Sequence, residues 1–171
     1  MKKGFGLILG LLITISAATA CGTPSNTEPI TNGAINDMNC QQIVDYIKST
    51  VAKNEYLAVR LHNDYVGVFS LNTVQQRSKW FLGVENVPMS DACAVESEIE
   101  PSDFSLVVIR LSSDVKYEQW RKTINDNISS MKWICAGAET KRVERIGDVI
   151  LVILADNTNA GNIANAFLTL S

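Results

Sequence analysis

The residues of this sequence that could do chemistry begin with a single histidine. His62 is followed by Asn63 and Asp64, and an imidazole beside a carboxylate is the arrangement of a general base and the group that orients it. The same three residues are typical of an exposed turn, where a histidine close to an aspartate is common. The turn is therefore the favoured interpretation, and catalysis by His62 with Asp64 is the alternative.

The cysteines offer a second route to catalysis. A thiolate nucleophile would pair His62 with Cys93 or Cys135. Neither cysteine has the flanking glycines or the helix start that would lower a thiol pKa, so both are expected to be structural. A Cys93–Cys135 disulfide is the favoured pairing, and three buried free thiols, with Cys40 on the apolar face of a predicted helix, are the alternative. The cysteine spacing fits no zinc site.

The densest group of charges is acidic and lies in the segment ESEIEPSD. If this segment is extended, alternation places Glu96, Glu98 and Glu100 on one side, with Asp103 after them. Such a group could bind Ca²⁺ or a cationic partner. A solvated loop is the favoured interpretation of the same residues.

Motifs of known catalytic and cofactor-binding sites are missing from the sequence. It contains no Gly-rich phosphate loop, no G-x-S-x-G, no S-x-x-K and no H-E-x-x-H. We therefore assign no catalytic residue, no metal site and no cofactor from the sequence.

The N-terminal segment is expected to be a signal peptide. Lys2 and Lys3 precede an apolar run at residues 5–15. This run has the length of the apolar part of a signal peptide and is short for a membrane span.

The residues that end this segment point to a lipid anchor. Ala18, Thr19 and Ala20 come directly before Cys21. This order resembles the lipobox of bacterial lipoproteins, in which the cysteine receives a diacylglyceryl group and becomes the first residue after cleavage. Leucine is usual where Ala18 stands, and Ala-x-Ala also suits ordinary secretory cleavage, so secretion and an uncleaved anchor are the alternatives.

The chain is expected to have three parts. Residues 1–20 form the signal peptide, and residues 21–36 hold the lipidated cysteine and a polar tether that contains Pro24 and Pro29. Residues 37–171 are long enough for one domain with its own core. The 15 basic and 18 acidic residues give a net charge of −3 and include no basic run, so nucleic acid is not an expected partner.

Hydrophobic spacing predicts the elements of this domain. Apolar residues at positions 40, 43, 44, 47 and 51 follow the period of a helix that Asn36 or Asp37 would cap. The runs FSLVVIRL (104–111) and VILVIL (149–154) have the composition of strands, the second that of a central strand. Other expected strands are 57–61, 65–71, 132–135 and 140–146, and other expected helices are 73–82, 113–130 and a last one that residues 156–158 cap. Residues 84–103 show no clear pattern.

Strands and helices alternate without a strict β-α-β period. The fold class that fits is α+β, with a largely antiparallel sheet and helices packed mainly on one face. The function expected for such a domain behind a lipid anchor is non-catalytic binding or an accessory role at the extracytoplasmic face of the cell membrane. Its partners would be the membrane, through the lipid on Cys21, and an envelope protein. A small envelope hydrolase or thiol-dependent enzyme that uses His62 with Asp64 or Cys93 is the alternative.

The order of several segments resembles a known family. The lipobox, Pro88-Met89-Ser90 before the acidic stretch, DFSLVVIR, and VERIGDVILVILAD before the last helix follow one another as in a family of small uncharacterised lipoproteins of Gram-positive bacteria, a domain of unknown function. The resemblance covers about residues 38–170. It implies an anchored extracytoplasmic α+β domain and supplies no activity.

Overall fold

The computed structural model describes residues 34–51, 55–99 and 102–171. The predicted signal peptide, Cys21 and most of the tether lie outside these residues, as does Glu100. Within the described part, no helix has both the length and the apolar character needed to span a bilayer.

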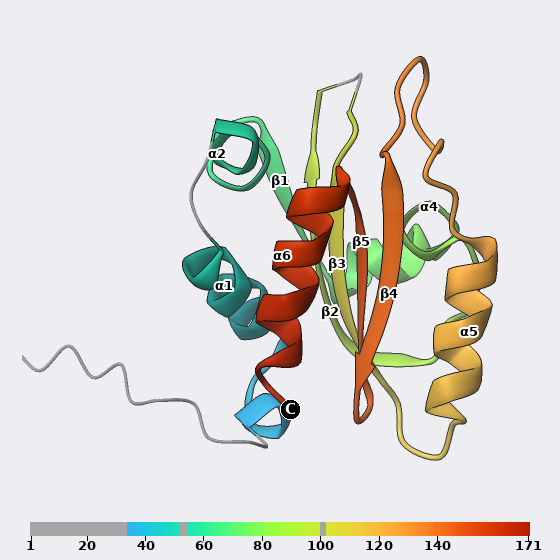
Figure 1. The fold of residues 1–171 in the computed structure, drawn as a ribbon. Helices are drawn as coiled ribbons and strands as arrows, with labels where there is room; N and C mark the ends of the chain where they lie inside the picture. Colours follow the sequence, from blue (N-terminus) through green and yellow to red (C-terminus); the bar gives the residue numbers. More distant parts are fainter. Residues whose placement is uncertain (1–33, 52–54, 100–101) are drawn as a thin grey trace, which may run out of the picture.

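An antiparallel sheet of five strands forms the centre of the domain (Figure 1). The strand order is β1-β2-β3-β5-β4, and every neighbouring pair is antiparallel. The strands are β1 (Val66–Ser70), β2 (Met89–Ser97), β3 (Ser105–Leu111), β4 (Thr140–Ile146) and β5 (Val149–Ala155).

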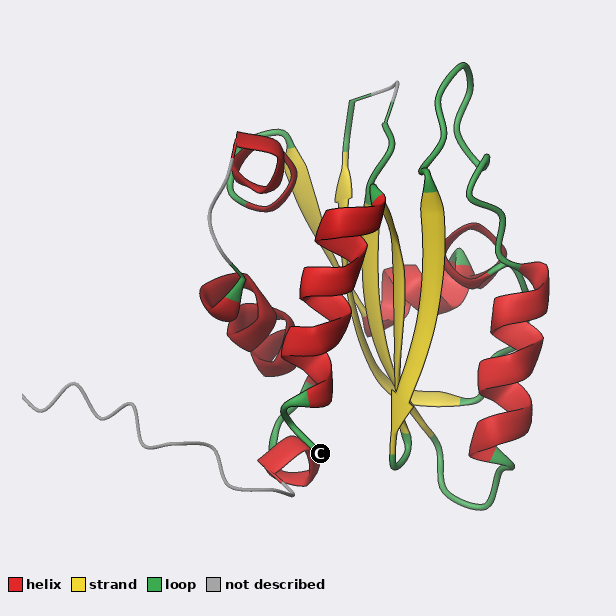
Figure 2. Cartoon of the chain, in the orientation of Figure 1, coloured by secondary structure: helices red, strands yellow, loops and turns green. Residues whose placement is uncertain are grey.

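Helices cover both faces of this sheet, as Figures 1 and 2 show. One face carries η1 (Ala34–Asp37), α1 (Cys40–Thr50), α2 (Glu55–Leu61) and α6 (Asn157–Leu168). The other face carries α3 (Leu71–Gln76), α4 (Ser78–Leu82) and α5 (Tyr117–Asn127). The α+β class is therefore confirmed, whereas the helices are shared between the faces and do not lie mainly on one.

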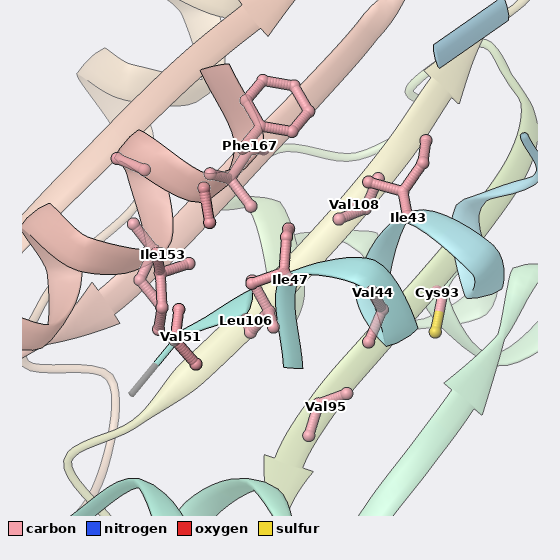
Figure 3. Close-up of a cluster of buried hydrophobic side chains, with 14 of the residues drawn as sticks. Ile43, Val44, Ile47, Val51, Cys93, Val95, Leu106, Val108, Ile153 and Phe167 are labelled. Carbon is pink, nitrogen blue, oxygen red and sulfur yellow. The ribbon is translucent and has the colours of Figure 1, made fainter. Parts of the chain in front are cut away.

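The central strands β3 and β5 contain long apolar runs because each of their faces meets a separate core. Leu106 and Val108 of β3 pack toward α1 and α6, together with Ile153 of β5 (Figure 3). The alternate residues Val107 and Ile109 belong to the core under α4 and α5. Strands that are buried on both faces need such continuous apolar runs, which explains the composition of β3 and β5.

The start of α1 is fixed by its cap and by its contact with the sheet. The Asn39 side chain accepts a hydrogen bond from the Gln42 amide at 2.8 Å, and the Gln42 side chain accepts one from the Asn39 amide, which completes a capping box. Arg110 of β3 donates to the carbonyl oxygens of Ile35 and Met38. The first described residues are thereby held at the end of the sheet where β3 finishes.

Three segments differ from their predicted structure. Residues 57–61, predicted as a strand, lie in α2, and residues 132–135, also predicted as a strand, lie in an irregular loop. The predicted helix 73–82 is split at Arg77, which ends α3 and precedes α4. Residues 84–103, which showed no pattern, contain β2.

Candidate functional site

A buried ion pair lies on the face of the sheet that α4 and α5 cover. Glu96 of β2 is only 3% exposed, and its Oε1 lies 2.8 Å from the Lys132 Nζ, with which it forms an ion pair. Two indoles complete the set: Trp133 Nε1 donates to Oε1 and Trp80 Nε1 donates to Oε2, both at 3.0 Å. Lys132 Nζ also donates to the Ser105 hydroxyl at 3.2 Å.

Four segments that are distant in the sequence meet at this pair. Alternation along β2 turns Glu96 to the same face as Ala94, and Ser105 of β3 lies opposite Glu96 in the sheet register. Trp80 comes from α4, and Lys132 with Trp133 comes from the loop after α5. A buried charge is tolerated when it is paired and hydrogen-bonded, and here each carboxylate oxygen has at least one donor.

Aromatic rings surround the ammonium group of this pair. Lys132 Nζ lies 5.1 Å from the Trp80 ring centre, 5.5 Å from that of Phe81 and 4.9 Å from that of Trp133. A cation over an aromatic face is attracted by the negative charge of that face, more strongly when water is excluded. The rings therefore help to hold Lys132 in place.

A cavity of about 300 Å³ opens beside the ion pair, and we refer to it as the aromatic cavity. Its lining residues come from β1, the α3–α4 junction, α4 and the end of β2; they are Phe69, Arg77, Trp80, Glu96, Ser97 and Glu98. Glu96 and Trp80 belong both to this lining and to the buried network. The cavity thus has a side wall that the network holds in place.

Arg77 supplies a positive charge at the rim of the aromatic cavity. Its backbone sits at the break between α3 and α4, where its carbonyl accepts hydrogen bonds from the Trp80 and Phe81 amides. Its guanidinium lies 5.2 Å from the ring centre of Phe81, with Trp80 at 5.7 Å and Phe69 at 6.0 Å. The side chain is exposed, and it makes no hydrogen bond or ion pair with the residues that the structure describes.

Glu98 supplies a negative charge at the same rim, and Gly67 makes room for it. Gly67 faces Glu96 across the β1–β2 pair. A Cβ on Gly67 would lie 2.6 Å from Cζ of Phe69 and 2.8 Å from Oε1 of Glu98, both too close. The Phe69 ring and the Glu98 carboxylate therefore occupy the space that a side chain at position 67 would need.

The predicted acidic group does not converge. Alternation does bring Glu96 and Glu98 to one cavity, but Glu96 is buried in its ion pair. Asp103 forms an ion pair with Arg60 of α2, with hydrogen bonds of 2.8 Å to both carboxylate oxygens. Within the described residues, no group of three or more acidic, histidine or cysteine side chains could hold a metal ion.

The residues of the alternative enzyme also lie apart. His62 and Asp64 are exposed in the turn between α2 and β1. Cys93 is buried and lies opposite Ser70, at the end of β1 that is farther from this turn. Its thiol donates a hydrogen bond to Oε1 of Gln41 at 3.3 Å. The structure therefore does not bring His62 and Cys93 together.

The predicted Cys93–Cys135 disulfide is not formed. Both residues are free thiols, as is Cys40. Cys93 faces the core under α1, whereas Cys135 is exposed in the loop after α5. Burial, with the nearby carboxylates of Asp45 and Asp91, raises the pKa of Cys93 to about 12. The same cause, burial above all, raises the pKa of Cys40.

A second hollow of about 200 Å³ lies between α2 and the end of β2. It is lined by three exposed residues, Val59, Tyr65 and Ile99. Its charged residues, Arg60 and Asp103, are already paired with each other. The aromatic cavity has unused charges and is therefore the stronger candidate site.

Comparison with known proteins identifies no relative. No family model matches the chain, and neither a curated protein nor a solved structure shows significant similarity to it.

Replacement of Glu96 by Gln should destabilise the domain because Lys132 would remain buried without a negative partner. The expected loss is about 3 kcal/mol in the free energy of unfolding, measured by urea denaturation. The matched control is Glu98→Gln just after the same strand, where an exposed side chain should change stability by less than about 0.5 kcal/mol. Equal losses in the two variants would show that the Glu96–Lys132 pair does not stabilise the fold.

Alkylation of the folded domain should distinguish the cysteines. Iodoacetamide at neutral pH should modify Cys135, while Cys40 and Cys93 should react only after unfolding, because burial keeps both protonated and covered. Peptide mass mapping with and without denaturant measures this difference. Detection of a disulfide-linked peptide that contains Cys93 and Cys135 would instead show that this disulfide forms.

Proposed function

We propose that this chain is a lipid-anchored domain of the cell envelope that binds a small ligand in the aromatic cavity without chemical change. The anchor rests on Ala18-Thr19-Ala20 before Cys21, and on the resemblance to small lipoproteins of Gram-positive bacteria. Two acyl chains, each contributing about 0.8 kcal/mol per buried methylene, would hold such a chain stably at a membrane.

The observation that carries the binding proposal is the contrast between the wall and the rim of the cavity. The wall is fixed, since the Trp80 indole donates a hydrogen bond to Glu96 and Glu96 forms an ion pair with Lys132. The rim presents Arg77 and Glu98, whose charged groups make no side-chain hydrogen bond or ion pair within the described residues. Ligand sites commonly combine a preformed apolar wall with a few polar groups that fix orientation.

The same contacts favour binding over catalysis. A general acid or base must reach the substrate, but Glu96 is buried, accepts hydrogen bonds from two indoles and is paired with Lys132. The Cys93 thiol is protonated at neutral pH because burial raises its pKa to about 12. The envelope-enzyme alternative therefore has no assembled set of groups in the described residues.

The place of the cavity in the fold suits an anchored receptor. Residues 34–38 lie where Arg110 of β3 holds them, and Asp91 is opposite Arg110 in the β2–β3 register. Glu96 is five residues farther along β2, about 17 Å at the rise of an extended strand. A membrane tether that joins before residue 34 would thus leave Glu96, and the cavity that it lines, at a distance from the start of the described domain.

The anchor can be tested by the intact mass of the protein from membranes of the cells that make it. A chain that begins at Cys21 and carries a diacylglyceryl group is the expected result. An unmodified chain that begins at Cys21 would mean ordinary secretion, and a mass that includes residues 1–20 would mean an uncleaved anchor.

Ligand binding can be tested with the indole N–H signals of the domain in nitrogen-15 NMR spectra. A panel of amino acids, short peptides, sugars, simple carboxylates and simple amines is added at millimolar concentration. At least one class should shift the Trp80 signal, since this indole lines the cavity, and should leave that of Trp120 on α5 unchanged. If no compound moves the Trp80 signal, or if Trp120 responds equally, the aromatic cavity is not a binding site.

A further inference from the structure

We infer that the aromatic cavity recognises a small zwitterion of the amino-acid type, with its carboxylate on Arg77 and its ammonium group on Glu98. This inference rests on the proposed function, since it names the ligand class of the same cavity. It is argued from the two rim charges, the lack of an ion pair between them, the aromatic ring near both and the size of the space.

Arg77 is prepared for a carboxylate. Its guanidinium has five donors in a planar fork, and such a fork binds a carboxylate through two parallel hydrogen bonds. Packing against the rings of Phe69, Trp80 and Phe81 limits its motion and leaves its edge with no partner in the described chain. Less side-chain entropy is then lost when the ligand binds.

Glu98 is prepared for an ammonium group. Its carboxylate lies over Gly67 and beside the edge of the Phe69 ring, where any larger residue at position 67 would displace both. The Glu98 amide donates to the carbonyl of Tyr65 at 2.9 Å, so the pairing of β1 with β2 extends to this residue and fixes its backbone. The carboxylate has no ion-pair partner in the described residues.

The two charges line one cavity without pairing with each other, since no nitrogen–oxygen distance between Arg77 and Glu98 is within 4.0 Å. The Phe69 ring is near both groups. A ligand with one negative and one positive end can bridge them. A simple anion would face Glu98 with like charge, and a simple cation would face Arg77 in the same way, so the rim selects against ligands with one charge.

The space admits a small ligand only. A volume of about 300 Å³ is at the lower limit of ligand pockets, which suits an amino acid or a dipeptide. The faces of Phe69 and Trp80 would receive its side chain.

The test compares zwitterions with derivatives that lack one charge. The probes are glycylglycine, L-serine, L-leucine and L-phenylalanine, each with its N-acetyl and its carboxamide form. They are titrated into the chain from residue 22 onward, and the Trp80 indole N–H signal is followed. At least one zwitterion should bind, and loss of either charge should weaken its affinity tenfold or more.

Two variants assign the charges to their partners. Arg77→Gln should weaken the affinity for the zwitterion tenfold or more, and it should not weaken the affinity for the carboxamide form, which has no carboxylate to lose its partner. Glu98→Gln should weaken the affinity for the zwitterion similarly, and it should not weaken the affinity for the N-acetyl form, which has no ammonium group to lose its partner. The matched control is Lys79→Gln, since Lys79 is exposed on α4 and does not line the cavity.

The outcomes separate this inference from the proposed function. Equal binding of blocked and zwitterionic probes would overturn the inference, as would binding of sugars or of singly charged compounds alone, and either result would leave a ligand-binding cavity. A Trp80 signal that no compound moves would overturn both.

Discussion

The contact between the Glu96 carboxylate and the Lys132 ammonium group is the constraint on which this face of the molecule depends. Removing two charges from water is costly, and the cost is offset only when each charge has its partner and its hydrogen bonds. The pair therefore requires β2, α4, β3 and the loop after α5 to meet in one arrangement. That arrangement holds Trp80 in place and, with it, one wall of the aromatic cavity.

Much of the fold could be predicted because its signals are local. The apolar stripe of α1 and the continuous apolar composition of β5 are periodic features that depend little on distant residues. The prediction of a strand at residues 57–61 was wrong for a specific reason. Apolar residues at 57, 59 and 61 fit one face of a strand, but Leu57 and Leu61 also fit one face of a helix. In the structure Leu57 and Leu61 are buried and Val59 is exposed, as the helix requires.

The loop after α5 shows how tertiary contacts override composition. Residues 132–135 have the aromatic and β-branched character of a strand. Lys132 and Trp133 instead turn toward Glu96, and Cys135 has a φ of 62°, which a strand does not allow. Only part of the candidate site could be predicted from the sequence, for the same reason. Alternation relates Glu96 to Glu98, but nothing local relates either residue to Arg77, Trp80 or Lys132.

The order of the strands also affects how the chain reaches its native state. β5 is the last strand in the sequence, yet it lies between β3 and β4 near the middle of the sheet. Because synthesis begins at the N-terminus, β1, β2 and β3 can pair early. The other edge of β3 stays unpaired until residues 149–155 have been made. A chain that stops before β5 would expose an apolar strand edge, the kind of surface from which aggregation begins. Synthesis of residues 149–155 is thus the step that covers this edge of β3.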